Sequence, residues 1–264
     1  MQNRSILTMC KGAIVGGTML VPGVSGGTMA IILGIYDQLV HAVASFRRQP
    51  RQNLLFLFLF CVGGGLGMLL FSRPLLSLLN AFPLPMGYFF IGAVAGSIPM
   101  IYQKSQPSSF SWHVPVYVLA GVVIVSLFSV LPTGVISSTG SWQPLLLIVT
   151  GIVAAAALVL PGISVSYLLL MLGLYDKTIA AISHLQFSFL LPLFIGLCIG
   201  ILLVTKILER LMDRHPRPTY LVILGFMLAS IASVFPGLPS LAVAPACVLT
   251  FAAGFFIIYR LSKL

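Results

Sequence analysis

Acidic side chains are scarce in this sequence, which has only four of them, Asp37, Asp176, Glu209 and Asp213, in 264 residues. Charged residues of both signs make up 7% of the chain, whereas hydrophobic residues make up 59%. A soluble domain carries about 25% charged residues, so this chain has too few of them to cover a water-exposed surface. The composition therefore predicts a protein whose solvent is a lipid bilayer.

Motifs of metal, redox and nucleotide chemistry are also missing. The four cysteines lie in or beside apolar segments without paired spacing, which is typical of small core residues rather than disulfides or zinc ligands. The sequence has no His-Glu-x-x-His, Walker A, Cys-x-x-Cys or Gly-x-Ser-x-Gly motif. We expect no cofactor and no metal site, and coupling to a proton or sodium gradient stays open.

Positive charge is plentiful by comparison, because 14 Lys and Arg residues give a net charge of +10. Nucleic-acid binding is one interpretation of such a balance. Here the basic residues fall in short loops between apolar segments, which is the pattern that orients a membrane protein. We therefore expect the bilayer as a partner and no nucleic acid.

One broken apolar pattern occurs twice. Residues 22–37 begin with Pro-Gly-x-Ser and end with Gly-x-Tyr-Asp, and residues 161–176 repeat this at an offset of 139 with seven of sixteen positions identical. Pro removes a helical hydrogen bond, so each pattern splits its apolar segment into arms of about ten residues. Such an arm covers about half of the hydrocarbon. We predict two re-entrant hairpins whose tips reach the midplane, and a kinked full crossing is the alternative.

The repeat continues at an offset of 133, where Gly63 matches Gly196 and Ser97 matches Ser230. Small-residue faces at Gly63–Gly67 and at Gly196 and Gly200 predict close helix packing. The predicted fold class is an all-α polytopic membrane protein with two inverted-topology repeats, each a re-entrant hairpin plus three transmembrane helices. Repeat 1 spans 1–136, with the hairpin at 12–45 and helices at 54–72, 86–102 and 114–132; repeat 2 spans 137–264, with the hairpin at 144–182 and helices at 187–205, 219–235 and 244–260.

Loop charges favour the re-entrant interpretation. With two hairpins and a cytoplasmic N-terminus, 12 basic residues lie inside and only Arg73 and Lys177 lie outside, whereas two full crossings give a split of 9 to 5. The positive-inside rule prefers the first arrangement, which puts both termini in the cytoplasm. Three crossings per repeat then invert the second half relative to the first, as in many secondary transporters with a site at the midplane.

The hairpin tips have the chemistry to bind an anion such as phosphate. Each break starts a half-helix whose first N–H groups and positive dipole end face the midplane. Hydroxyl groups add donors, and glycines let an anion approach the backbone. The predicted phosphate-binding residues are Gly23, Ser25, Gly26, Gly27 and Thr28 in the first hairpin and Gly162, Ser164 and Ser166 in the second. A role in helix packing alone is the other interpretation of these residues.

Two of the acidic residues are repeat partners at the hairpin exits. In this topology Asp37 shares the cytoplasmic side with Lys206, and Asp176 shares the outer side with Arg73. We hypothesise two ion pairs, Asp37–Lys206 and Asp176–Arg73, that latch the access states or hold a coupling proton. Interfacial charges or hairpin caps are an equally good interpretation.

Two stretches carry a resemblance to a known family, PGVSGGTMAIILGIYDQLV and PGISVSYLLLMLGLYD. Through them the chain resembles the bacterial polyprenyl-phosphate transporter family over nearly its whole length. It departs from the family pattern at Val165, where that pattern has Gly. The resemblance implies a multi-pass protein of the bacterial cytoplasmic membrane. Its partner would be undecaprenyl phosphate, a C55 lipid carrier moved from the outer to the inner leaflet for reuse in peptidoglycan and other envelope polymers. The head would sit between the hairpin tips while one half rocks against the other. The oligomeric state stays open.

Two other functions fit parts of the sequence. Membrane undecaprenyl-pyrophosphate phosphatases resemble it through a similar tip, PGxSRS, but they need an Arg where this chain has Gly26 and Val165, and a paired-carboxylate motif that it lacks. We therefore expect no enzyme. A secondary transporter of small anions shares the hairpins, and the lack of a charge-lined pore disfavours it only mildly.

Overall fold

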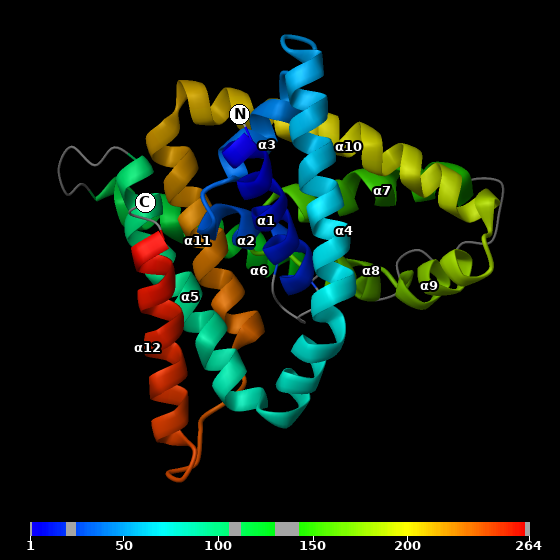
Figure 1. Cartoon of the computed structure of the whole chain (residues 1–264). Helices are drawn as coiled ribbons and strands as arrows, with labels where there is room; N and C mark the ends of the chain where they lie inside the picture. The colour runs from blue at the N-terminus through cyan, green and yellow to red at the C-terminus, as the bar shows by residue number, and fades with distance from the viewer. Residues whose placement is uncertain (1, 20–24, 106–111, 130–142, 262–264) are drawn as a thin grey trace.

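The computed structural model describes residues 2–19, 25–105, 112–129 and 143–261, and every regular element in these residues is an α-helix (Figure 1). The helices of the first half are α1 (Gln2–Thr18), α2 (Gly26–Ile32), α3 (Tyr36–Ala44), α4 (Pro50–Ala81), α5 (Pro83–Lys104) and α6 (His113–Ser129). Those of the second half are α7 (Gln143–Val159), α8 (Val165–Met171), α9 (Tyr175–Ser183), α10 (Phe187–Arg214), α11 (Pro216–Val234) and α12 (Ala244–Leu261).

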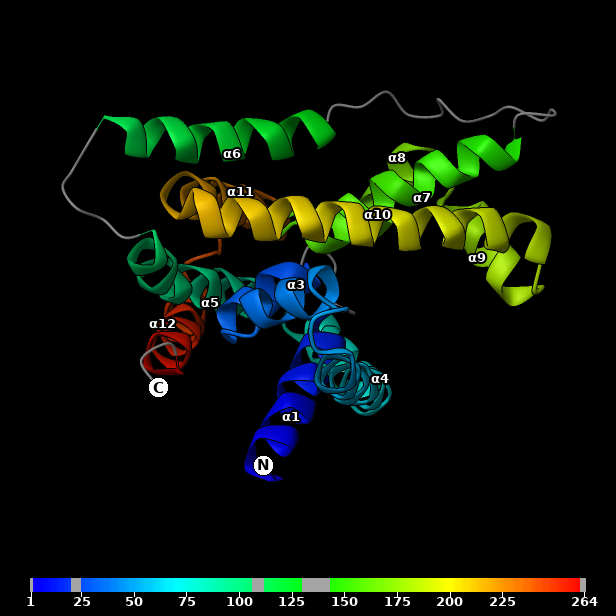
Figure 2. The same cartoon turned by 90° about the horizontal axis from the view of Figure 1, so that it is seen from above.

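The two halves share one order of helices. α1 and α7 each have 17 residues, α2 and α8 each have 7, and α3 and α9 each have 9. The long helices α4 and α10 follow in both halves but run in different directions, as Figures 1 and 2 show. The inverted relation between the halves stays a prediction.

Both short arms end at a glycine of the Gly-x-Tyr-Asp pattern. Gly34 has φ +64° and Gly173 has φ +69°, a left-handed conformation that only glycine adopts without cost. In the first half the N–H of Gly34 donates to Ile31 and the N–H of Ile35 donates to Ala30, which is a Schellman cap, and the second half has the same two bonds. After the cap the chain turns by 116° from α2 into α3.

The long helices present apolar surface of the length that a bilayer requires. Three stretches in the described residues, Pro50–Phe71, Pro83–Lys104 and Phe187–Arg214, are long and apolar enough to cross a membrane. The other predicted crossings correspond to shorter apolar helices, His113–Leu127, Pro216–Ala232 and Ala244–Arg260, and residues 130–132 lie outside the described residues. Large side chains such as Leu70 on α4 and Phe194 on α10 are exposed. The chain is therefore an all-α polytopic membrane protein, as the composition predicts.

Glycines join the helices into close pairs. A Cβ added at Gly63 of α4 would lie 2.2 Å from the Met9 carbonyl oxygen of α1, and a Cβ at Gly196 of α10 would lie 2.0 Å from the Ile148 oxygen of α7. No real side chain fits at such a distance, so the backbones of α1 and α4, and of α7 and α10, touch. The predicted close packing at Gly63 and Gly196 is confirmed. A Cβ at Gly67 would lie 2.0 Å from the Ala13 oxygen and one at Gly200 would lie 2.6 Å from the Ala155 Cβ, whereas a Cβ at Gly65 has no atom within 4 Å.

Two further pairs exchange helices between the halves. α5 of the first half packs on α12 of the second, and α11 of the second packs on α6 of the first (Figures 1 and 2). A Cβ at Gly92 would lie 2.1 Å from the Phe251 oxygen, and a Cβ at Gly225 would lie 2.1 Å from the Val118 oxygen. Because each of these pairs takes one helix from each half, the halves are interlocked.

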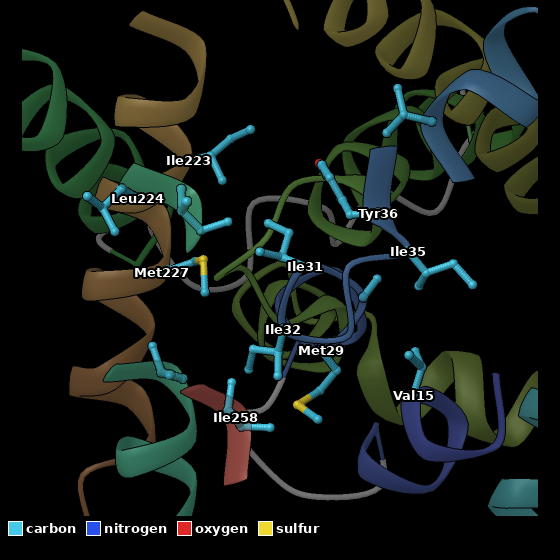
Figure 3. Packing of buried hydrophobic residues seen from close by; sticks show 14 of the residues in the cluster. Val15, Met29, Ile31, Ile32, Ile35, Tyr36, Ile223, Leu224, Met227 and Ile258 are labelled. Atoms are coloured by element: carbon cyan, nitrogen blue, oxygen red, sulfur yellow. The ribbon is translucent and has the colours of Figure 1, made fainter. Parts of the chain in front are cut away.

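The arm α2 lies at the centre of the main hydrophobic cluster. Every residue from Gly27 to Ile32 is buried. Figure 3 shows Met29, Ile31 and Ile32 among side chains from α1, α11 and α12, including Val15, Met227 and Ile258. α8 is less enclosed, because its Leu170 is 53% exposed. The first broken segment therefore occupies the core, and the second lies closer to the surface.

Candidate functional site

The two broken segments meet at their tips. The backbone N–H of Gly162 donates a buried hydrogen bond of 3.0 Å to the Thr28 hydroxyl. One residue earlier, a Cβ at Gly27 would lie 3.2 Å from the Pro161 Cα, so the start of α2 rests against the second Pro-Gly break. The sequence predicts that the two tips share one site, and these contacts bring them together.

A tyrosine provides a second contact between the segments. The Tyr36 hydroxyl donates a hydrogen bond of 2.9 Å to the carbonyl oxygen of Val159, the last residue of α7. That carbonyl is one of those left without a helical partner where α7 ends. Tyr36 is 4% exposed, whereas its repeat partner Tyr175 is 36% exposed. Tyr36 therefore joins α3, which follows the first broken segment, to the end of α7, where the second break begins.

Gly162 is held between the first hairpin and α11. Its φ of +86° lies in the left-handed region, and a Cβ there would be 2.2 Å from the Phe226 carbonyl oxygen. Both the conformation and the close approach require glycine at this position.

A small cavity with a mostly apolar wall and three hydroxyl groups lies beside these contacts, inside the apolar core. Its volume is about 10 Å3, and its polar lining consists of Ser25, Thr28 and Ser230. Apolar side chains from α2, α5 and α11 complete the wall. A cavity of about 10–15 Å3 holds one water molecule, so a phosphate group does not fit in this conformation. The predicted site is closed.

The predicted site residues fall into three groups. Ser25, Gly27, Thr28 and Gly162 gather at the junction, and Ser164 follows it as a half-buried residue. A Cβ at Gly26 would lie 2.9 Å from the Met19 sulfur, so this glycine faces α1. Gly23 and the side chain of Ser166 lie outside the described part of the chain.

Ser230 is a site residue that the sequence did not single out. It is 2% exposed, and its hydroxyl donates 2.7 Å to the Met227 carbonyl of its own helix. Its repeat partner Ser97 makes the same bond to Val94 but does not line the cavity. In the sequence, the match between Ser97 and Ser230 indicates the repeat, but it does not distinguish the serine that lines the cavity from the one that does not.

The arms differ from the predicted length of about ten residues, because the helices before the breaks, α1 and α7, have 17 residues each and those after them are shorter. α2 and α8 have seven residues each, because the Schellman caps end them early. Two turns align few peptide dipoles, so hydroxyl groups and single N–H groups matter more here than a helix dipole.

The hypothesised ion pairs are not found. Asp37, in the first turn of α3, pairs with Lys104 in the last turn of α5, and Lys206 points instead into a basic pocket beside α10. Asp176 and Arg73 are both exposed, and no ion pair in the described residues includes either of them. Asp37 pairs with Lys104 because the first turn of α3 lies beside the end of α5, a helix of the same half of the chain.

Polar contacts also fix the remainder of α3 to α10. The Glu209 carboxylate accepts a hydrogen bond of 2.6 Å from the Ser45 hydroxyl and lies 2.8 Å from the His41 Nδ1. The His41 Nε2 lies 3.8 Å from Asp213. The exit of the first hairpin is therefore attached to both halves of the molecule.

Long apolar helices around two interrupted segments, which are joined by a buried hydrogen bond, define a polytopic membrane protein. The chain belongs to the family described as "VCA0040-like: Undecaprenyl phosphate translocase-like", whose sequence profile matches residues 15–246.

Two relatives bear the name polyprenyl-phosphate transporter. The Staphylococcus aureus protein is 31% identical over 253 residues, which cover 91% of this chain and 89% of the relative. The Vibrio cholerae serotype O1 protein is 28% identical over 249 residues, which cover 87% of this chain and 77% of the relative. No solved structure matches the chain.

Proposed function

We propose that this protein translocates undecaprenyl phosphate across the bacterial cytoplasmic membrane, from the outer to the inner leaflet, so that the lipid can be reused in peptidoglycan and envelope polymer synthesis. The family and the names of both relatives support transport of a polyprenyl phosphate. The observation that carries the proposal for this chain is the hydrogen bond from Gly162 to Thr28, which joins the two broken segments beside a small cavity with three hydroxyl groups.

The phosphate head replaces that hydrogen bond when the site opens. Separating the tips frees the Gly162 N–H and exposes the hydroxyls of Ser25, Thr28 and Ser230. A phosphate oxygen accepts hydrogen bonds from all of these groups, and bonds to an ionised acceptor are about twice as strong as neutral ones. In the closed conformation the Gly162 N–H donates to Thr28 and the Ser230 hydroxyl donates to Met227, so these two buried donors are paired without a ligand.

The isoprenoid tail has an apolar surface close to the same junction. A pocket of about 440 Å3 lies among α7, α8, α9 and α10, and its lining includes Val165, one residue after Ser164. Leu169, Leu197 and Phe194 contribute to its walls. A tail lying here stays in apolar surroundings while its head is at the tips.

The membrane orientation in this proposal has both termini in the cytoplasm and the two halves as inverted repeats. Arg47 and Arg48 from the turn after α3 lie around one pocket with Lys206, Arg210 and Arg214 from the end of α10, which supports a common side for these two basic regions.

A phosphatase activity is not part of the proposal. In the resembling phosphatase tip an Arg takes the place of Gly26, and here a Cβ at Gly26 would already lie 2.9 Å from the Met19 sulfur. A larger side chain at this position would therefore require the flexible Met19 side chain to move.

A leaflet-specific assay in liposomes tests the proposed function. The purified protein is reconstituted with undecaprenyl phosphate, and the lipid in each leaflet is followed with and without Ser25→Ala, Ser230→Ala or Ser97→Ala. We expect the first two variants to slow translocation at least about tenfold, because each removes a donor to phosphate. Ser97→Ala is the matched control, since its hydroxyl lies outside the cavity.

Equal rates in wild type, both cavity variants and empty liposomes would contradict the proposal. Inorganic phosphate at millimolar concentration separates it from the small-anion alternative. A lipid transporter moves no soluble phosphate across the bilayer, whereas a small-anion transporter accumulates it inside the liposomes.

A further inference from the structure

A second concave site with phosphate-binding character lies apart from the hairpin tips, between the turn that follows α3 and the last turns of α10. The pocket has a volume of about 920 Å3. Five cationic side chains line it: Arg47 and Arg48 from the turn, and Lys206, Arg210 and Arg214 from α10. On α10 their spacing of four residues, from Lys206 to Arg210 to Arg214, puts all three on one face of the helix.

The acidic residues of the pocket are already engaged. Glu209 accepts its hydrogen bond from Ser45 and lies against His41, and His41 also lies 3.8 Å from Asp213. Across the described residues, no ion pair within 4.0 Å includes any of the five cations. Five positive groups therefore face two carboxylates, of which Glu209 is hydrogen-bonded to Ser45, and the pocket carries an excess of positive charge.

The floor of the pocket is apolar. Val43, Leu57 and Leu202 line it together with the ring of Phe46. Leu202 is 48% exposed on α10, on the side that continues along the lipid-facing surface of this helix. A ligand that complements both the cationic side chains and the apolar residues of the pocket has an anionic head and an apolar chain. A fully hydrophilic anion would leave the apolar residues uncovered.

We propose that this pocket binds the phosphate monoester head of a lipid with an isoprenoid chain, as a docking station at the membrane surface through which the lipid enters or leaves the hairpin site. The inference rests on the proposed function for the identity of the lipid. Arg47 and Arg210 hold the phosphate from opposite walls, since an Arg fork matches phosphate oxygens with two parallel hydrogen bonds. The first isoprenoid units lie on Leu57 and Leu202.

Binding of farnesyl phosphate, a short phosphate monoester of the same chemistry, tests the site in purified full-length protein in detergent. The double variant Arg47→Gln/Arg210→Gln is compared with wild type and with Arg51→Gln. Arg51 is the matched control, because it is an exposed arginine three residues from Arg48 and does not line the pocket. We expect the double variant to bind at least about tenfold more weakly and the control to stay within about twofold of wild type.

Further probes identify what the pocket recognises. Farnesol should not bind, since it lacks the phosphate, and inorganic phosphate should compete only weakly, since it leaves the apolar floor uncovered. Equal affinity of wild type and the double variant for farnesyl phosphate would overturn the proposal, as would equal affinity for farnesol. Tight binding of inorganic phosphate alone would overturn the lipid assignment in favour of a soluble anion.

Translocation assays in liposomes separate this inference from the proposed function. Loss of binding in the double variant together with slower translocation at low lipid concentration supports both. Full translocation by the double variant at every lipid concentration would overturn the docking station and leave the proposed function standing. A wild-type protein that binds farnesyl phosphate through this pocket but never translocates undecaprenyl phosphate would contradict the proposed function and leave the binding site intact.

Discussion

The Thr28 hydroxyl accepts a hydrogen bond of 3.0 Å from the backbone N–H of Gly162, so each of the two tips satisfies a polar group of the other. Both groups belong to the predicted phosphate site. Under the proposed function, a phosphate oxygen would replace Thr28 as the acceptor of the Gly162 N–H.

Replacing Thr28 with valine removes the acceptor and keeps the shape of the side chain. The Gly162 N–H is then buried without a partner, which costs about 1–3 kcal/mol. We expect lower thermal stability in detergent and impaired translocation for Thr28→Val. Thr28→Ser keeps the hydroxyl and should stay close to wild type in both measurements. Similar behaviour of the two variants would show that the hydrogen bond has no role.

Alanine at position 162 should be far more damaging than alanine at most other glycines. The left-handed φ of Gly162 costs about 1–2 kcal/mol for an L residue, and the new Cβ would be 2.2 Å from the Phe226 oxygen. We expect Gly162→Ala to lower the unfolding temperature strongly or to prevent folding. Gly65→Ala, on the exposed side of α4 where no atom lies within 4 Å of the added Cβ, should be neutral or slightly stabilising. Comparable unfolding temperatures for the two variants would contradict this geometry.

The two tyrosines of the repeated pattern should differ in importance. Tyr36→Phe removes a largely buried hydrogen bond to Val159 and should cost about 0.5–1.5 kcal/mol. Tyr175→Phe changes a residue that is 36% exposed and should stay within about 0.5 kcal/mol of wild type. Chemical unfolding of the two variants in detergent measures this difference. A larger loss for Tyr175→Phe would mean that the second hairpin is the one held in place by its tyrosine.

Charge exchange distinguishes Lys104 from Lys206 as the partner of Asp37. Asp37→Lys alone puts two positive charges together and should reduce translocation. Adding Lys104→Asp restores an ion pair of opposite polarity and should recover much of the activity, whereas adding Lys206→Asp should not. Both members of the pair are about one-third exposed, so the effect on stability is small and the transport rate is the informative readout. Rescue by Lys206→Asp would restore the pairing expected from the sequence.

Local features of the sequence predicted a large part of this structure. Composition indicates the membrane class, the Pro161-Gly162 pair marks the break between α7 and α8, and small residues at Gly63 and Gly196 mark close helix contacts. Each of these signals acts over a few residues. The junction of the tips was also predictable, since Thr28 and Gly162 carry the polar chemistry of the two breaks.

Other features depend on how distant helices are rotated against one another, and no short pattern records that. Asp37 meets Lys104 rather than Lys206 because α3 starts beside the end of α5. Ser230 faces the cavity while Ser97 does not, although the two residues match in the repeat and make the same bond to their own helices. The exchange of α6 and α12 between the halves leaves no trace in hydropathy or spacing.

That exchange determines which parts of the protein can move as rigid bodies. A half that rocks as one piece would have to pull α6 away from α11 and α12 away from α5, where the backbones touch at Gly225 and Gly92. The natural moving units are instead the four glycine-sealed pairs, α1 with α4, α7 with α10, α5 with α12 and α6 with α11. Opening of the proposed site would then separate these pairs around α2, which lies at the centre of the main hydrophobic cluster.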